Sequence, residues 1–355
     1  GCVPSKALLS SAKHYNAISE SSKFGFSASA EPVNIAEVMA KVQEVIAQIA
    51  PHDSVERFTG LGATVYRGYG SFVDEQSVKV NDDIISAKYF IIATGSSPVV
   101  HPIPGLNEVS YLTNETIFNL QATPEHLVVI GGGPIGCELA QAFLMLGIKV
   151  SLLNLGKILP RDEADLVAEL RQNMLNQGLN LYEDIQIIKI SSGTAGQIEI
   201  SVEIGGKEQT ISGSHLLVAT GRKVNIDKLN LSAAGIEHTS RGIQVDECLR
   251  TSNKKVFAIG DVAGGYQFTH IAGYHAGVVI RNIIFRQRAK VNYQAVPWVT
   301  YTYPELAHVG LLESEAQNKY SGNITISEFE HKENDRAQAE RALHGKIKLI
   351  KNKKG

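Results

Sequence analysis

A cysteine and a lysine stand one helical turn apart at the start of the chain, in the run Gly1-Cys2-Val3-Pro4-Ser5-Lys6. Pro4 suits the first position of a helix, because the N–H that proline lacks would have no partner there. The sequence therefore predicts a helix from Pro4 onward, with Cys2 at its positive end. That position, with Lys6 one turn in, favours the thiolate used in redox and nucleophilic chemistry. A lone cysteine before a helix is nevertheless more often structural than reactive.

A glycine-rich motif follows an apolar run in the middle of the chain. Residues 127–130 predict a buried strand, and Gly131-Gly132-Gly133-Pro134-Ile135-Gly136 then opens a helix. This G-x-G-x-x-G order between a strand and a helix is the fingerprint of a dinucleotide site. Gly131 permits the tight turn, Gly133 lets backbone amides approach a pyrophosphate, and Gly136 allows helix and strand to pack closely. The helix N-terminus also attracts phosphate charge, so we predict a nucleotide site here.

The residue after the next predicted strand, 149–153, helps to choose between the two nicotinamide cofactors. An acid there binds the ribose 2′-hydroxyl of NAD, whereas a nearby arginine accepts the 2′-phosphate of NADP. Asn154 holds this place and can bond a hydroxyl without repelling a phosphate. Lys157 and Arg161 follow, but positions 155 and 156 carry no arginine. The residues leave both cofactors open and favour NADH.

Two similar predicted strands, each ending in Ala-Thr-Gly, flank this unit. Residues 89–92 lead into Ala93-Thr94-Gly95, and residues 216–218 lead into Ala219-Thr220-Gly221. Each could simply be a buried strand closed by a glycine turn. Their repetition indicates two copies of one nucleotide-binding plan.

A third predicted strand, 256–259, ends in Gly260-Asp261 ahead of a helix predicted from Thr269 to Ile284. An acid at the carboxyl end of a strand, beside a helix N-terminus, is well placed to bond the sugar hydroxyls of a cofactor. Asp261 is therefore a second candidate ligand-binding residue.

Composition limits the classes of function. With 355 residues, 43% of them apolar, the chain can form two or three domains with their own cores. A net charge of −2 and scattered lysines and arginines offer no basic surface for nucleic acid or an anionic membrane. No apolar run approaches the roughly 20 residues that span a bilayer. Three cysteines are too few for a secreted disulfide scaffold, so we expect a cytoplasmic protein.

The other cysteines and the histidines give no sign of further chemistry. Cys137 lies in the fingerprint helix, where a small apolar side chain suits packing, and Cys248 lies in a predicted surface strand at 245–250. The eleven histidines show no metal-ligand spacing, so we predict no metal site.

In their order along the chain, these motifs resemble those of the FAD-dependent pyridine nucleotide-disulfide oxidoreductases, the group of dihydrolipoamide dehydrogenase, glutathione reductase and mercuric reductase. The resemblance implies an α/β fold with two Rossmann-like nucleotide-binding domains, for FAD and NAD(P), and the start of an α+β dimerisation domain. It covers essentially the whole chain and rests on Cys2 to Lys6, the two Ala-Thr-Gly repeats with Arg222, Gly131 to Glu138, Gly260-Asp261-Val262, Thr302 to Glu305, Val309-Gly310 and Glu313.

The resemblance implies a role for each catalytic candidate. Cys2 corresponds to the flavin-proximal cysteine of a Cys-x4-Cys disulfide, whose other cysteine is expected four residues before Gly1. Lys6 would approach the flavin and pair with Glu138, since a lysine charge stabilises the reduced flavin anion and a carboxylate keeps the lysine in place.

The resemblance also implies the cofactor contacts. Gly70 corresponds to an adenine-contacting turn, Asp261 to the residue that holds the ribityl or pyrophosphate region, and 267–270 to a helix start beside the flavin. The implied FAD contacts are Lys6, Gly70, Ala93, Thr94, Gly95, Asp261, Gln267, Phe268, Thr269 and His270. The implied NAD(P) contacts are Gly131, Gly133, Ile135, Gly136, Glu138, Asn154 and Gly221.

The implied domain order is discontinuous. Residues 1–101 and 225–292 would form the FAD domain, with a helical excursion at 34–58, and residues 102–224 the NAD(P) domain. Residues 293–355 would begin a dimerisation domain, so we expect a homodimer. Both ends are expected to be cut: the FAD fingerprint would precede Gly1, and a predicted strand at 345–351 runs into a turn at 352–355.

The implied activity is an electron relay from NAD(P)H to FAD and then to the disulfide that contains Cys2. That disulfide would reduce a small-molecule substrate, either a disulfide, a dithiol-type compound or a metal ion, and a dihydrolipoamide dehydrogenase runs the reaction reversibly. Two alternatives remain: a non-enzymatic flavin redox sensor, and a quinone reductase or transhydrogenase that bypasses the disulfide. Cys2 argues against the latter, which would not need it.

Overall fold

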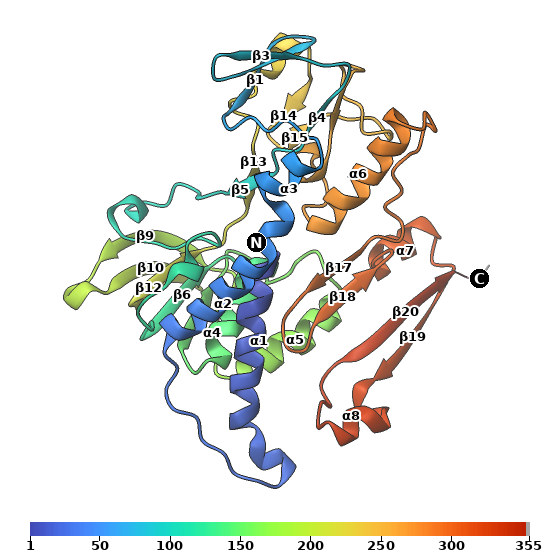
Figure 1. Cartoon of the computed structure of the whole chain (residues 1–355). Coiled ribbons are helices and arrows are strands. Elements are labelled where there is room, and N and C mark those ends of the chain that lie inside the picture. The colour runs from blue at the N-terminus through green and yellow to red at the C-terminus, as the bar shows by residue number, and fades with distance from the viewer. Residues whose placement is uncertain (353–355) are drawn as a thin grey trace. The chain divides into compact units, whose positions relative to one another are not determined.

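The computed structural model describes residues 1–352, and these fall into two compact units that we treat separately (Figure 1). The first unit combines residues 1–48 and 100–221 with the chain from 294 onward, and the second combines 49–99 with 222–293. The three-domain division stays a prediction. Both units mix helices with parallel strands, so the predicted α/β class is confirmed.

The first unit contains a four-stranded parallel sheet in the order β12-β6-β7-β8. Helix α4 connects β6 to β7 and α5 connects β7 to β8, so the strand–helix–strand unit predicted around the glycine motif is present. The elements are β6 (His126–Ile130), α4 (Pro134–Met145), β7 (Lys149–Leu153), α5 (Ala164–Asn176), β8 (Asn180–Tyr182) and β12 (His215–Val218).

Alternate residues of β6 face two different cores. Leu127 and Val129 pack with α1, α2 and α4, whereas Val128 and Ile130 pack with an antiparallel meander. The meander consists of β9 (Gln186–Ser192), β10 (Ile198–Ile204) and β11 (Lys207–Gly213). Because side chains of a strand alternate between faces, a continuous apolar run is what a strand covered on both sides requires.

Helix α1 (Cys2–Ser19) begins two residues earlier than predicted. Gly1 is its N-cap, so Pro4 is the third helical residue, where a missing N–H still costs no intrahelical bond. Leu8 and Leu9 of α1 are buried in the core shared with α2 (Ile35–Ile49). The predicted helical excursion at 34–58 comprises α2 and the beginning of α3 (Val55–Gly60).

The second unit is built from short sheets. The elements are β1 (Gly70–Asp74), β2 (Ser77–Val80), β3 (Asp83–Ser86), β4 (Phe90–Ile92), β5 (Ser96–Pro98), β13 (Arg222–Val224), β14 (His238–Thr239), β15 (Gly242–Ile243), β16 (Val256–Ala258) and α6 (Thr269–Ile283). Strand β4 pairs with β16 in parallel, and β5 pairs with β13 antiparallel.

Two predictions in this unit are wrong. Gly70 does not lie in a turn but begins β1, where it pairs with Val80 in the antiparallel ladder. Residues 245–250 do not form a surface strand, because Asp246 folds them into a turn by accepting the backbone N–H groups of Cys248 and Arg250. Cys248 is buried in that turn.

The C-terminal part of the first unit contains β17 (Pro297–Thr300), β18 (Leu306–Val309), α7 (Glu313–Lys319), β19 (Ile324–Glu330), α8 (Asp335–Ala339) and β20 (Lys346–Asn352) (Figure 1). The strand predicted at 345–351 is confirmed, and β19 pairs with it antiparallel. Residues 353–355 of the predicted turn lie outside the described residues. Among residues 1–352, no helix has both the length and the apolar character required to cross a membrane.

Two lysines of β20, Lys346 and Lys348, point inward. Lys348 is 7% exposed and contacts carboxylates of Glu163, Asp165 and Glu313 at 3.1, 3.3 and 2.5 Å. Burial alone would lower the pKa of Lys348, but its hydrogen bonds to Glu313 and Glu163 outweigh burial and raise it. This cluster ties β20 to α5 and α7.

Replacing Lys348 tests that tie. Lys348→Met removes the cation from the nearly buried Glu163 and the partly buried Glu313, while Asp165 keeps its pair with Lys346. We therefore expect the free energy of unfolding to fall by about 1–3 kcal/mol. Lys351→Met, an exposed neighbour on the same strand, should change it by less than about 0.5 kcal/mol. Urea titrations of both variants measure the difference, and equal losses would contradict the role of the cluster.

The same cluster predicts an acid-sensitive stability. Burial would raise the pKa of Asp165, but hydrogen bonds from Lys346 and Lys348 outweigh it and lower the pKa below the usual value. A carboxyl with a lowered folded-state pKa stabilises the protein above its unfolded pKa of about 3.9 and loses this contribution as pH falls. We expect Asp165→Asn to flatten the fall in unfolding free energy below about pH 4. Urea midpoints between pH 7 and pH 3 would contradict this if both proteins lost stability equally.

Candidate active site

The strand-to-helix turn after β6 has the geometry of a dinucleotide site. Gly131 has a φ of 114°, and a Cβ there would lie 2.3 Å from the carbonyl oxygen of Ala219. A Cβ on Gly136 would lie 1.8 Å from the carbonyl oxygen of Gly131. A Cβ on Gly133, in contrast, would meet nothing within 4 Å. Packing therefore requires glycine at 131 and 136, whereas Gly133 leaves open space for a ligand.

The first turn of α4 offers backbone amides to an anion. Gly133 caps the helix without a side-chain hydrogen bond, and Pro134 has no N–H. The amides of Ile135 and Gly136 are therefore the first donors at the positive end of the helix dipole. This donor set fits the pyrophosphate of a nicotinamide dinucleotide.

Asn154 is engaged by the protein itself. Its Oδ1 accepts the N–H of Gly132 at 2.8 Å, and its Nδ2 donates to the carbonyls of Gly156 and Lys157 at 3.0 and 2.9 Å. Both amide hydrogens are used, so one lone pair of Oδ1 is left for a ribose hydroxyl. The structure shows Asn154 bracing the glycine turn, and its contact with the ribose stays a prediction. Gly221, with a φ of 139°, follows β12 in the same unit.

Lys6 and Glu138 join α1 to α4. Lys6 Nζ lies 2.6 Å from Glu138 Oε2, and Glu138 Oε1 accepts the backbone N–H of Tyr301 at 2.9 Å. The Glu138 side chain is 9% exposed, so both carboxylate oxygens are held in a nearly buried place. Cys2 precedes Lys6 by four residues and therefore shares its side of α1. The structure thus groups the three predicted catalytic residues in the first unit.

The three cysteines differ in accessibility. Cys2 is exposed, whereas Cys137 and Cys248 are buried. Burial, followed by the nearby carboxylate of Glu138, raises the pKa of the Cys137 thiol, whose S–H faces the carbonyl of Gly132 at 3.5 Å. Cys137 is thus kept as an inert thiol, while Cys2 is open to a reactant.

In the second unit, the predicted Ala93-Thr94-Gly95 segment connects β4 to β5. Thr94 Oγ1 donates to the carbonyl of Asn225 at 2.7 Å, and Asn225 Nδ2 donates back to the carbonyl of Thr94 at 3.0 Å. Gly95 has a φ of 66° and accepts the N–H of Asn225 at 3.0 Å. These bonds hold the turn in one conformation.

Asp261 lies just after β16 and keeps one oxygen available. Its Oδ2 accepts from Ser96 Oγ at 2.5 Å and lies 3.7 Å from Nε of Arg222. Within the described part of the chain, no hydrogen bond reaches its Oδ1. A partly exposed carboxylate with one open oxygen fits the hydroxyls of a flavin side chain.

His275 supports the backbone before Asp261. Its Nδ1 accepts the N–H of Gly260 at 3.1 Å, so its Nε2 carries the proton that faces Tyr293 Oη at 2.8 Å. Burial lowers the pKa of His275, which keeps this neutral form. The predicted FAD segment continues from Gln267 to Phe268, the N-cap of α6, and Thr269 and His270 form the first turn.

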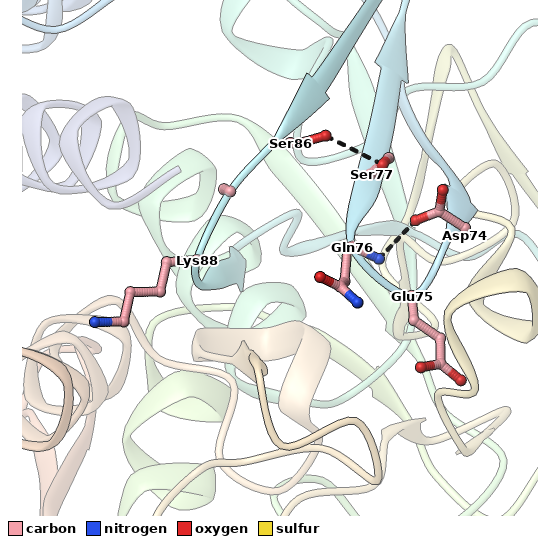
Figure 2. Close-up of a pocket in the computed structure, with 7 residues that line it drawn as sticks. Asp74, Glu75, Gln76, Ser77, Ser86 and Lys88 are labelled. Carbon is pink, nitrogen blue, oxygen red and sulfur yellow. Dashed lines mark hydrogen bonds between the residues drawn. The ribbon is translucent and has the colours of Figure 1, made fainter.

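A shallow hollow of about 690 Å³ lies in the second unit beside the β1–β2–β3 turns. Figure 2 shows the side chains that line it, among them Asp74, Gln76, Ser77 and Ser86. Asp74 Oδ1 accepts the N–H of Gln76, and Ser77 and Ser86 bond each other. The polar groups therefore close the β1–β2–β3 turns on themselves. None of the predicted site residues lines this hollow, and we assign it no function.

Sequence reasoning missed several residues that brace the site. Tyr301 acts on Glu138 through its backbone, and a backbone contact leaves no mark on residue type. Gln141 is fully buried and binds both the N–H and the carbonyl of Tyr303. A polar residue three positions after Glu138 on an otherwise apolar helix was the signal that could have revealed it.

Named relatives match most of the chain. Mercuric reductases from Staphylococcus aureus and Bacillus cereus are 36% and 38% identical over 90% of it, but it spans only 58% and 51% of their own lengths. A dihydrolipoyl dehydrogenase from Staphylococcus aureus is 34% identical over 99% of this chain and 75% of its own. The HOCl-induced flavoprotein disulfide reductase RclA from Escherichia coli superposes on the whole chain with a TM-score of 0.86 at 25% identity, and 77% of that structure is covered.

Alanine at Gly133 and at Gly136 should separate ligand binding from folding. Gly136→Ala drives a Cβ into the Gly131 carbonyl, so we expect a loss of about 1–3 kcal/mol in unfolding free energy. Gly133 has a φ of −78° and open space, so Gly133→Ala should melt like the wild type but bind NADH at least about tenfold more weakly. Thermal melts and NADH fluorescence titrations compare the two, and identical behaviour would contradict the assignment.

Two family models match the chain in succession. The model described as pyridine nucleotide-disulphide oxidoreductase matches residues 1–276, and the dimerisation-domain model of the same family matches residues 296–355. The first match alone covers more than half of the chain and includes the Cys2, Gly131 and Asp261 motifs. The chain therefore belongs to the pyridine nucleotide-disulphide oxidoreductases, flavoproteins that use FAD and NAD(P)H.

Proposed function

We propose that this chain is the core of an NAD(P)H-dependent flavoprotein reductase that works through a disulfide containing Cys2. The observation that carries the proposal is the Lys6–Glu138 ion pair. The pair lies one helical turn from the exposed Cys2, and Glu138 stands on the same helix that opens with the nucleotide turn. Helix α4 would thus contact the electron donor, NAD(P)H, at its N-terminus and, through Glu138, hold the lysine that serves the electron acceptor, the flavin.

The residues of the chain have distinct tasks in this proposal. Bound FAD would supply the two-electron chemistry that links NAD(P)H to the disulfide, so that one hydride and one proton from solvent together convert the disulfide into two thiols. Lys6 would offer a positive charge to the anion of the reduced flavin, and Glu138 holds the Lys6 ammonium by a charge-assisted hydrogen bond. Cys2, exposed at the start of α1, would supply one sulfur of the disulfide.

Two groups of residues would hold the cofactors. The amides at the start of α4 take the nicotinamide dinucleotide, while the Thr94–Gly95 turn and the open oxygen of Asp261 take FAD. NADH is the favoured donor, since Lys157 is already neutralised by Asp184 at 2.5 Å, a hydrogen bond that raises the pKa of Lys157. A 2′-phosphate would have to compete with Asp184 for this cation.

The substrate belongs to one of three classes: a disulfide, a dithiol-type compound or a metal ion. The relatives support this range, since they are named mercuric reductases, dihydrolipoyl dehydrogenases and a flavoprotein disulfide reductase. The match from 296 onward to a dimerisation domain supports a homodimer. We propose a cytoplasmic location from the composition of the chain.

Removing Cys2 tests the disulfide relay. In the FAD-loaded full-length protein, Cys2→Ser should reduce NADH consumption with a small disulfide substrate to background, because no disulfide can form. NADH should still bleach the flavin in a single turnover. Cys248→Ser, a change at a buried thiol, should retain wild-type turnover.

Two outcomes would overturn the proposal in different ways. Wild-type turnover by the Cys2→Ser protein, especially with a quinone, would favour a reductase that bypasses the disulfide. A wild-type protein whose flavin is reduced once but which consumes no NADH in the steady state with any of the three substrate classes would favour a redox sensor.

A further inference from the structure

We propose that Tyr301 is a positioning residue for the Lys6–Glu138 ion pair, which we call the redox pair. The backbone N–H of Tyr301 holds Glu138, and its ring holds the ammonium of Lys6. The inference rests on the proposed function, in which that ammonium faces the reduced flavin. It also gives the C-terminal segment, which matches a dimerisation domain from residue 296, a task at the redox pair of its own chain.

The carboxylate of Glu138 is held from two sides. Glu138 Oε2 accepts from Lys6 at 2.6 Å and Oε1 accepts from the Tyr301 amide at 2.9 Å. One donor on each oxygen defines the plane of the carboxylate and leaves it little room to rotate. The amide thereby aims Oε2 at Lys6.

The ammonium of Lys6 is held from three sides. Lys6 Nζ donates to Glu138 at 2.6 Å and to Ser5 Oγ at 3.3 Å, and it lies 4.1 Å from the centre of the Tyr301 ring. A cation within about 6 Å of an aromatic centre is attracted to the face of the ring. The Lys6 side chain is still 33% exposed, so without the ring its flexible stem could turn the ammonium toward water.

Tyr301 is itself anchored to α4. Strand β17 ends at Thr300, and two residues after Tyr301 the buried Gln141 accepts the N–H of Tyr303 and donates to its carbonyl, both at 2.7 Å. Thr302 is fully buried and donates to the carbonyl of Pro304 at 2.8 Å. Glu138 and Gln141, three residues apart on one face of α4, thus bind the backbone of this segment. These bonds fix the position of the Tyr301 ring.

The next tyrosine supplies a matched control. Tyr303 is 38% exposed and Tyr301 is 40% exposed, and each has a lysine of α1 over its ring. Lys13 Nζ lies 5.8 Å from the Tyr303 ring centre and 3.1 Å from Glu305 Oε1, away from the redox pair. Loss of the Tyr303 ring therefore leaves the Lys6–Glu138 pair untouched.

The test measures the exposure of Lys6 and the potential of the flavin in FAD-loaded full-length protein. The rate of acylation by an N-hydroxysuccinimide acetate is followed at Lys6 and Lys13 by peptide mass spectrometry. We expect Tyr301→Leu to raise the Lys6 rate by about 2- to 30-fold, the factor set by a lost cation–π contact. It should also make the flavin midpoint potential more negative, since the reduced anion loses a positioned positive charge.

Three further variants complete the comparison. Tyr301→Phe keeps the ring and should restore wild-type values for both measurements. Tyr303→Leu should accelerate acylation of Lys13 alone. Should Tyr301→Leu fail to fold, Tyr301→Met provides bulk without a ring and carries the same expectation.

The proposal is overturned if ring-less variants at 301 leave Lys6 acylation at the wild-type rate, if Tyr303→Leu raises the Lys6 rate as much, or if Tyr301→Phe behaves like Tyr301→Leu. Lys6 acylation does not depend on turnover. Normal turnover by the Cys2→Ser protein would therefore refute the disulfide relay without touching this comparison, and an unchanged Lys6 rate would refute the role of Tyr301 without touching the relay.

Discussion

The rest of the site depends on one constraint, which is that the nearly buried carboxylate of Glu138 must have a hydrogen-bond donor on each oxygen. A nearly buried carboxylate is costly unless each oxygen has a donor, and here Lys6 and the Tyr301 amide supply them. These donors come from segments almost 300 residues apart, so α1, α4 and the segment after β17 must meet for the charge to be tolerated. Cys2 gains its position from the same requirement, because it precedes Lys6 by one helical turn.

Helix α4 connects the nucleotide turn to this charge. The close approach of Gly136 to the Gly131 carbonyl presses the start of the helix against the end of β6, leaving no room for adjustment there. Five residues after the N-cap, Glu138 faces α1, so a dinucleotide at the helix start and the redox pair share one rigid element. Asn154 and the neutral His275 play a comparable part in the two units, since each uses its polar atoms to brace a turn that is to meet a cofactor.

Local motifs made much of this predictable, and long-range contacts limited the rest. The strand at 149–153, the glycine turn and the helix from Thr269 each depend on residues adjacent in sequence, and the structure has them in those places. The family resemblance predicts a turn at Gly70, but the pairing of Gly70 with Val80, ten residues further along, makes it the first residue of a strand. Lys346 and Lys348 face inward because they pair with carboxylates at the start of α5, far away in the sequence. The alternation of residues in β20 does not by itself show which face is buried. Tyr301 escaped notice since its hydrogen bond to Glu138 uses an atom that almost every residue has.

The central claim is that Cys2, beside the Lys6–Glu138 pair, works as half of a flavin-linked disulfide. Anaerobic reductive titration of the FAD-loaded full-length protein, followed by absorption, tests it most directly. The account predicts a long-wavelength charge-transfer band after the first two electrons, from the Cys2 thiolate to oxidised flavin, with the flavin bleaching only as further electrons are added. Bleaching of the flavin by the first two electrons, with no such band, would contradict it.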